Sequence, residues 1–278
     1  MPELPEVETI KTALEKSLGK CRIESININN YRLREEVPCD IADVITGAQI
    51  LKYQRRAKYI IISLNNKYSL IWHMGMSGKI SITESKNRYD KHDHIIIKTS
   101  KGYITYNDPR RFGLFTYCKT NDLDKFHLFC NIGIEPFDEK FSAEYLYSKI
   151  RKKASPIKIV IMDQSIVVGI GNIYASEALF GAKISPFRPA NKVTLAECEK
   201  LVYNVQSVLK KAIAAGGSTL RDYEKPDGGL GYFQNQHCVY QKTGQRCPDC
   251  TCDLEKTKGI QKATMGGRST FYCPHKQK

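Results

Sequence analysis

Long apolar runs are absent from this sequence. No stretch approaches the roughly 18 consecutive apolar residues that a helix needs to cross a bilayer, and no apolar signal-peptide core follows the amino terminus. We therefore expect a soluble, cytoplasmic protein without a membrane partner. The sequence also contains no internal repeats.

Negative charge is scarce compared with positive charge. Lys and Arg total 43 against 29 Asp and Glu, which gives a formal net charge of +14 and a pI near 9.2. This excess suggests a polyanionic partner, and charge alone leaves nucleic acid and an anionic membrane surface both open. Hydrophobic residues make up 41% of the 278 residues, which is enough for a real core in two modest domains with a small appendage.

The first half of the chain combines one helix with many strands. Apolar side chains at helical spacing predict a helix over residues 5–18, with Pro5 in its first turn and Gly19 as its stop. Short β-rich runs separated by turn residues follow from about residue 22 to 118. This pattern is typical of a β-sandwich or barrel.

The second half is predicted to be helical. Residues 119–141 show little periodicity and are interpreted as a linker, and the Gly-rich stretch 217–237 predicts a long functional loop. A small cysteine-bearing module follows from residue 238. The helices between these segments are predicted at 142–152, 172–181 and 194–214.

The cysteines divide into two groups. Cys247-x-x-Cys250 followed by Cys273 has the spacing of three zinc thiolates. In a reducing cytosol the singly scattered cysteines are most simply small buried hydrophobes, and these are Cys21, Cys39, Cys118, Cys130 and Cys198.

The amino terminus carries a potential nucleophile. Once Met1 is removed, Pro2 has a secondary amine whose pKa is expected to be roughly 8, so it can attack an electrophilic carbon and form an iminium. Glu3 is close enough to give or take a proton. Alone, this start is also compatible with an ordinary helix beginning that has a charge in its first turn.

Several motifs occur in an order that resembles the formamidopyrimidine-DNA glycosylase family from end to end. That resemblance implies an α+β fold: an N-terminal β-sandwich with a leading helix, then a helix-two-turn-helix domain and a zinc-finger β-hairpin. The motifs are Pro2-Glu3, Arg56-Ala57-Lys58-Tyr59, His73-Met74-Gly75-Met76-Ser77-Gly78, Lys91-His92-Asp93-His94, Asp108-Pro109-Arg110-Arg111-Phe112-Gly113, Gly169-Ile170-Gly171-Asn172-Ile173-Tyr174-Ala175-Ser176-Glu177 and the cysteine module.

The resemblance also implies domain limits. We expect a catalytic sandwich domain over residues 1–118 and a linker over 119–141. A helix-two-turn-helix domain with a lesion-recognition loop is expected over 142–237, and a zinc-finger hairpin over 238–278.

The resemblance assigns chemistry to four residues. Pro2 would attack C1′ of a damaged nucleotide flipped out of the duplex, and Glu3 would protonate the sugar ring oxygen. Lys58 matches a further proton donor in β-elimination; alone, it would be taken as a phosphate contact or a solvated charge. Arg268 matches the finger arginine of δ-elimination, and it can bind a phosphate at the same time.

Six further residues are expected to contact DNA. Met76, Arg111 and Phe112 match a triad that fills the void left by the flipped base. Without the family context, Met76 and Phe112 would be ordinary core residues, but the neighbouring Gly75, Gly78 and Gly113 favour loop tips.

The other three contacts are His92, Lys153 and Asn172. Asn172 is expected to hold a phosphate at the N-terminus of its helix, and a structural N-cap is the alternative. His92 could instead be a buried structural histidine. Lys153 is expected to replace a basic residue that the family usually has where this chain has Ala154.

The zinc module departs from the family at one position. The fourth ligand should be a cysteine at 276, where the sequence has Lys276, and a protonated lysine has no lone pair for zinc. We expect one structural Zn²⁺ held by Cys247, Cys250, Cys273 and His275. Recruitment of Cys252 and a hairpin without metal are the alternatives.

These observations predict a bifunctional DNA glycosylase and abasic-site lyase of base excision repair. It would be a nucleoid-associated monomer that acts on damaged double-stranded DNA, excises oxidised purines and nicks the strand by β,δ-elimination. The alternatives are an endonuclease-VIII-like glycosylase for oxidised pyrimidines and a non-catalytic protein that binds damaged DNA.

Overall fold

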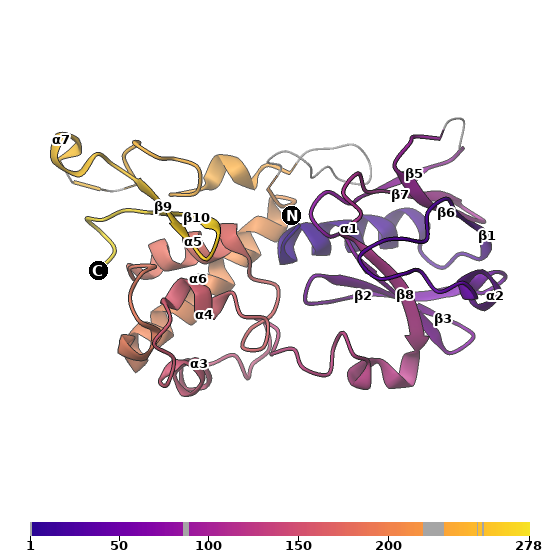
Figure 1. Ribbon diagram of the computed structural model, residues 1–278, viewed down its shortest axis with the longest axis horizontal. Helices are drawn as coiled ribbons and strands as arrows, with labels where there is room; N and C mark the ends of the chain where they lie inside the picture. Colours follow the sequence, from indigo (N-terminus) through magenta and orange to yellow (C-terminus); the bar gives the residue numbers. More distant parts are fainter. Residues whose placement is uncertain (1, 86–88, 219–230, 249, 252) are drawn as a thin grey trace. The chain divides into compact units, whose positions relative to one another are not determined.

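The computed structural model describes residues 2–85, 89–218, 231–248, 250–251 and 253–278 (Figure 1). The chain forms two compact units: the first joins residues 1–130 with 212–234, and the second joins 131–211 with 235–278. Within the described ranges, no helix is both long and apolar enough to cross a membrane.

The first unit begins with helix α1 (Leu4–Leu18), as the sequence predicts. Glu3 is its N-cap and Gly19, with φ of +51°, ends it. The helix holds an apolar stripe against the core, and that stripe consists of Leu4, Val7, Ile10, Leu14 and Leu18. Burying the stripe fixes the helix that directly follows the amino terminus.

Two four-stranded antiparallel sheets form the body of this unit. One has the order β1-β6-β7-β5 and the other β2-β3-β4-β8. The strands of the first are β1 (Ile23–Ile28), β5 (Lys79–Thr83), β6 (Asp93–Thr99) and β7 (Gly102–Asn107). Those of the second are β2 (Ile50–Arg56), β3 (Tyr59–Leu64), β4 (Tyr68–His73) and β8 (Leu114–Lys119), and the short helices α2 (Ile41–Ile45) and η1 (Thr120–Lys125) accompany the sheets.

The core lies between these layers. α1 packs on strands of both sheets (Figure 1). Trp72 is fully buried at the centre, with its ring centroid 4.7 Å from that of Phe115 and 5.4 Å from that of Tyr106. Because Trp72 and Tyr106 come from different sheets, this aromatic cluster joins the two. The predicted β-sandwich with a leading helix is confirmed.

The second unit is largely helical and ends in a hairpin. Its described helices are α3 (Ala143–Ile150), α4 (Ile157–Ile161), α5 (Asn172–Ala182), η2 (Ala190–Lys192), most of α6 (Leu195–Ala214), and α7 (Leu254–Thr257). The helix η3 (Phe233–Gln236) spans the boundary between the two units. Strands β9 (Gln261–Met265) and β10 (Arg268–Tyr272) pair antiparallel around Gly266-Gly267, whose φ angles are +54° and +71°. Two positive φ angles are those of a type I′ turn, which glycine adopts readily.

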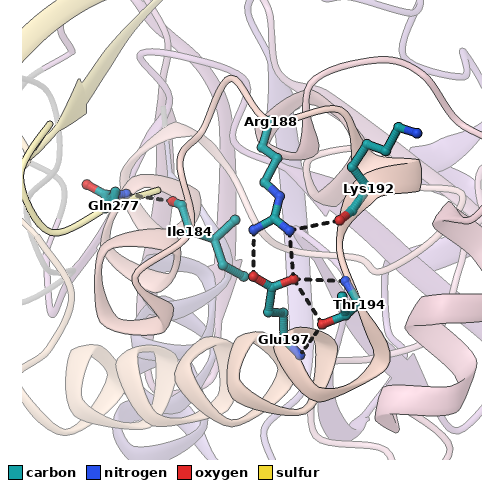
Figure 2. A network of polar contacts seen from close by, with 6 residues as sticks. All are labelled: Ile184, Arg188, Lys192, Thr194, Glu197 and Gln277. Carbon is teal, nitrogen blue, oxygen red and sulfur yellow. Dashed lines mark hydrogen bonds and ion pairs between the residues drawn. The ribbon is translucent and has the colours of Figure 1, made fainter.

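The three predicted helices correspond to α3, α5 and α6, whereas the short α4 and α7 were not predicted. A reciprocal pair of hydrogen bonds caps α6, because Glu197 N–H donates to Thr194 Oγ1 and Thr194 N–H donates to Glu197 Oε2. Figure 2 shows the Arg188 guanidinium forming a forked pair with the same carboxylate.

The predicted burial of the five scattered cysteines is confirmed for Cys21, Cys118 and Cys198. It is wrong for Cys39 and Cys130, which are exposed.

The predicted loop 217–237 is described only in part. Residues 219–230 lie outside the described residues, and η3 occupies 233–236.

Candidate active site and DNA interface

The amino-terminal turn is held by a reciprocal cap. Glu3 N–H donates to Glu6 Oε2 at 2.9 Å, and the Glu3 carboxylate accepts the backbone N–H of Glu6. Pro2 and Glu3 are both buried. The candidate nucleophile and its neighbouring acid therefore stand at a fixed helix start.

Glu6 also binds the segment that begins the Gly-rich loop. Its Oε1 accepts the backbone N–H of Ser218 at 2.8 Å, and both residues belong to the first unit. A Cβ at Gly217, where φ is +79°, would lie 2.9 Å from the same oxygen. A buried carboxylate thus joins the Glu3 backbone to residues 217–218, which explains why residues 212–234 cluster with the first unit.

Lys58 lies in the two-residue turn between β2 and β3, next to Ala57 with φ of +53°. Its side chain is buried, which excludes a solvated charge. Arg55 supports the turn by donating to the Ala57 carbonyl at 2.9 Å and to Glu8 of α1 at 2.8 Å. The helix that carries the amino terminus is therefore tied directly to the turn that carries Lys58.

The charges around Glu8 favour its ionised form. Burial acts to raise the pKa of Glu8, but hydrogen bonds and charges from Lys11 and Arg55 outweigh it and lower the pKa below the ordinary value of 4.5. The Glu8–Arg55 pair is therefore intact at neutral pH.

Met76 and Phe112 lie on two neighbouring loops and are 38% and 44% exposed. This exposure excludes the core interpretation. A Cβ at Gly75 would collide with the backbone of Phe112, so the two loops touch where Gly75 lies. Arg111 has φ of +56° and is exposed, and the Arg110 guanidinium lies 4.7 Å from the centre of the Phe112 ring.

A buried carboxylate clamps these two loops together. Asp108 is completely buried, and its Oδ1 accepts the Ser77 hydroxyl at 2.6 Å. Its Oδ2 accepts the Gly113 N–H at 2.8 Å and the Tyr106 hydroxyl at 3.0 Å. The Met76 loop and the Arg111–Phe112 loop are consequently one hydrogen-bonded unit. Asp108 belongs to one of the sequence motifs, but its role as a clamp was not predicted.

The three histidines nearby differ in environment. His92, the predicted DNA contact, is half-buried, whereas His94 is buried and its Nε2 lies 2.8 Å from the Asp108 carbonyl oxygen. His73 accepts the Gly75 N–H through Nδ1 at 2.9 Å. Burial, with the charges of Arg34 and Lys58, lowers the pKa of His73 to about 3, so its imidazole is neutral at physiological pH.

In the second unit, a buried lysine connects α5 to the hairpin. Lys158 Nζ donates to Asn172 Oδ1 at 2.7 Å, to Thr270 Oγ1 at 2.8 Å and to the Ser269 carbonyl at 3.3 Å. The Asn172 amide donates to the Ser269 carbonyl at 2.9 Å and to the Tyr240 hydroxyl at 3.4 Å. Asn172 is the first residue of α5, as expected for a residue at the N-terminus of this helix. Gly171 is the N-cap, so the alternative of a structural Asn N-cap is excluded.

Lys153 and Arg268 meet at one surface cavity of about 340 Å³, together with Asp163. Lys153 Nζ lies 3.6 Å from Asp163 Oδ2. The structure thus brings together two of the basic residues that the sequence analysis selected from distant positions.

The three zinc-spaced thiols also converge. Cys247, Cys250 and Cys273 are buried, with their sulfur atoms all within 4.8 Å of one another. Burial and the two neighbouring thiols raise the pKa of Cys247. The structure does not bring His275 into this cluster: its side chain is exposed. Cys252 lies outside the described residues.

Glu177 is a structural residue whose role the sequence did not reveal. Its buried carboxylate accepts three consecutive backbone N–H groups, those of Cys238, Val239 and Tyr240, at 2.7, 3.0 and 2.8 Å. Burial raises the pKa of Glu177, although these three bonds oppose the shift. Glu177 therefore anchors the entry to the hairpin module on α5.

Two family models match the chain. Residues 1–115 match the formamidopyrimidine-DNA glycosylase N-terminal domain, and residues 132–224 match the formamidopyrimidine-DNA glycosylase H2TH domain. These matches define the class of protein, a two-domain chain with a helix-two-turn-helix. The chain belongs to the formamidopyrimidine-DNA glycosylase family.

Individual relatives are similar to this chain over its whole length. The chain is 43% identical to the formamidopyrimidine-DNA glycosylase of Rhodospirillum rubrum, covering 100% of both chains, and 44% identical to that of Rickettsia felis, covering 98% and 97%. It is also similar to solved structures of the Lactococcus lactis protein. The complex with DNA containing an abasic site has 34% identity, a TM-score of 0.90 and 99% coverage of both chains. The complex with N7-benzyl-Fapy-dG DNA has the same identity and TM-score with 100% coverage.

Proposed function

We propose that this chain is a bifunctional DNA glycosylase and abasic-site lyase of base excision repair that removes oxidised purines, including 8-oxoguanine and formamidopyrimidines. The observation that carries the proposal is the capped amino-terminal turn, which holds Pro2 and Glu3 in the same unit as the buried Lys58 turn. Such a protein would work at the nucleoid in the cytoplasm.

The proposed reaction starts with removal of Met1, which leaves Pro2 with a secondary amine. The nitrogen lone pair attacks C1′ of the flipped nucleotide, the glycosidic bond breaks, and its electrons leave with the base. Glu3 gives a proton to the sugar ring oxygen and so promotes ring opening. The nitrogen gives up its N–H proton, which the departing base takes up, and the bond between C1′ and the ring oxygen breaks as Glu3 protonates that oxygen. The product of these steps is an iminium that links Pro2 to the open sugar.

Strand cleavage follows from that iminium. It acidifies the C2′ protons, and loss of one of them expels the 3′ phosphate, with Lys58 as the proton donor in this β-elimination. Burial of the Lys58 side chain supports a role at a reacting group rather than in solvent. Arg268 would bind the remaining phosphate and assist its expulsion by δ-elimination.

DNA recognition is assigned to residues of both units. Met76 and Phe112, exposed on loops that Asp108 joins, would occupy the void left by the flipped base, and Arg111 would bond the orphaned partner base. In the second unit, Lys153 and Arg268 around one cavity favour phosphate binding. His92 and the backbone at Asn172 are further proposed contacts.

We also propose that Zn²⁺ binds the cysteine cluster. Three buried thiols within 4.8 Å of one another fit three positions of a tetrahedral zinc site. The ion would supply structural cross-linking of the hairpin module. Lys276 does not fit as the fourth ligand, because its ammonium has no lone pair.

An incision assay with a lesion panel tests the function. Duplexes carrying 8-oxoguanine opposite cytosine, a formamidopyrimidine or an oxidised pyrimidine are compared with undamaged DNA under single-turnover conditions. We expect the purine lesions to react fastest. The oxidised pyrimidine belongs in the panel because the Lactococcus lactis relative has been solved with DNA containing one. Faster cleavage of that lesion would favour the endonuclease-VIII-like alternative, and binding without incision of any duplex would favour a non-catalytic protein.

A further inference from the structure

Lys276 stands in the sequence where a fourth zinc ligand is expected, and it makes a hydrogen bond of its own. It follows Cys273 by three residues, the spacing at which a fourth thiolate would stand. Its ammonium donates to the carbonyl oxygen of Pro248, the residue directly after Cys247. It also lies 5.6 Å from the centre of the Phe180 ring. Lys276 thus connects the Cys273 segment to the Cys247–Cys250 segment, which is the connection that a shared metal would make.

Neighbouring bonds close the same region without any metal. The buried Gln277 accepts the Cys273 N–H through Oε1 at 2.8 Å. Figure 2 shows its second bond, in which Nε2 donates to the Ile184 carbonyl at 2.9 Å. Arg246 donates to the Cys250 carbonyl at 3.0 Å. The three thiols pack in an apolar cluster with Phe180, Val239, Ile260 and Phe271. The hairpin module therefore has a core and cross-links of its own.

The charge of the site supports this arrangement. Three thiolates with one Zn²⁺ have a net charge of −1, and the Lys276 ammonium, bound to the carbonyl of the residue after Cys247, brings the sum of these charges to zero. Four thiolates with the same ion would leave −2 in a buried site, and uncompensated buried charge is costly. A lysine bound to the carbonyl of the residue after Cys247 therefore suits a site with three thiolates better than a site with four.

We propose that Lys276 replaces the fourth zinc ligand as a positioning residue, so that the metal has three protein thiolates and an exchangeable small donor, and the hairpin module remains folded without metal. The inference deepens the zinc proposal above and rests on it only for the metal. The bond from Lys276 to Pro248 is present in the protein itself.

The first experiment counts the ligands. Metal-free protein is titrated with Co²⁺ alone, and the intensity of the sulfur-to-cobalt charge-transfer band reports the number of thiolates. We expect three in the wild type, three in Cys252→Ser, an unchanged spectrum in His275→Ala, and four with tighter binding in Lys276→Cys. A weaker band in Cys252→Ser, or a changed spectrum in His275→Ala, would identify a fourth protein ligand and overturn the open position.

The second experiment tests the lysine without metal. Hydrogen exchange of the backbone amides in residues 261–272 is measured in metal-free wild type, Lys276→Met and Lys256→Met, the last being a lysine of the same module with 85% of its side chain exposed. Loss of a charge-assisted hydrogen bond is expected to speed exchange about 10-fold or more in Lys276→Met. We expect wild type and Lys256→Met to remain equally protected.

The two experiments test different parts of the proposal, so a negative result in one does not decide the other. Absence of cobalt binding in every variant, including Lys276→Cys, would reject the metal site while the exchange data still decide the role of Lys276. Unprotected amides in metal-free wild type, or equal protection in Lys276→Met, would show that Lys276 does not hold the module. Lesion incision is measured independently of both, so neither result is confused with failure of the proposed glycosylase.

Discussion

Ser77 and Asp108 are joined by a hydrogen bond of 2.6 Å, in which the serine hydroxyl donates to a completely buried carboxylate. The two residues are 31 positions apart in the chain. Ser77 follows Met76, and Asp108 also binds the backbone of Gly113, which follows Phe112. The bond therefore couples the two loops that we propose to enter DNA, and a wedge made of two loops needs such coupling to hold its shape.

Asp108→Asn should uncouple these loops. The carboxylate accepts from Ser77 and Arg110 at one oxygen and from Tyr106 and Gly113 at the other. An amide nitrogen in place of one oxygen would face donors, so we expect a loss of about 2–4 kcal/mol in unfolding free energy. Thermal unfolding and single-turnover incision should both decline, whereas the exposed Asp124→Asn should change neither. Wild-type stability in Asp108→Asn would contradict the clamp.

Glu6→Gln should impair chemistry more than folding. One carboxylate oxygen of Glu6 accepts the Glu3 N–H and the other accepts the Ser218 N–H. The substitution turns one of these two oxygens into an NH₂ donor, and the resulting clash of donors shifts the amino-terminal turn. Small displacements of reacting groups cost on the order of 10- to 100-fold in rate. Single-turnover excision of 8-oxoguanine is the measurement, and Glu15→Gln on the exposed side of the same helix is the control. An unchanged rate in Glu6→Gln would remove this residue from the positioning of the nucleophile.

His73 should make stability depend on pH. Its pKa is about 3 when folded, against an ordinary value of 6.5, so the unfolded chain binds the proton first as pH falls. Stability is fully present above about pH 6.5 and should decline by about 1.4 kcal/mol per pH unit between pH 6 and pH 4.

The variant His73→Asn isolates this effect, because its amide oxygen can still accept the Gly75 N–H but does not titrate. The difference in unfolding free energy between wild type and variant should change across this window. His127→Asn, at an exposed position, should follow the wild type. A constant difference between wild type and His73→Asn would show that His73 titrates normally.

DNA affinity should fall steeply with salt, in keeping with a net charge of +14. Each phosphate contact contributes about 0.9 to the slope of log affinity against log salt concentration. Lys153→Met should reduce the magnitude of that slope by about 0.9, the contribution of one phosphate contact. Lys98 pairs with Glu24 at 2.8 Å, so Lys98→Met should leave the slope unchanged. Fluorescence anisotropy at several salt concentrations measures both. A flat response in the wild type would contradict binding through phosphates.

Local patterns in the sequence were sufficient for much of the fold. Apolar periodicity and turn residues gave α1, the sandwich strands and the long helices, because these elements bury the stripes that the sequence displays. Glycines at 75 and 113 correctly indicated loop tips, since the crowding that requires them is local.

Roles that depend on distant partners were not accessible in the same way. The partners in these contacts lie at least 28 positions away in the chain: the Ser77 hydroxyl that binds Asp108, the three N–H groups bound by Glu177, and the Pro248 carbonyl bound by Lys276. The substitution at position 276 was visible in the sequence, but the bond that it makes was not. The start of α5 at Asn172 was predicted correctly, whereas the N-cap role of Gly171 was not predicted, because Gly171 and Asn172 are both suitable N-cap residues.

The central claim is that the Pro2 amine is the nucleophile. Borohydride reduction during reaction with a duplex containing 8-oxoguanine opposite cytosine, using protein with Met1 removed, traps any iminium as a stable adduct. We predict one covalent band whose peptide map places the sugar on Pro2, and strong loss of that band in Pro2→Gly. An adduct on another residue, or a full-strength band in Pro2→Gly, would contradict the account.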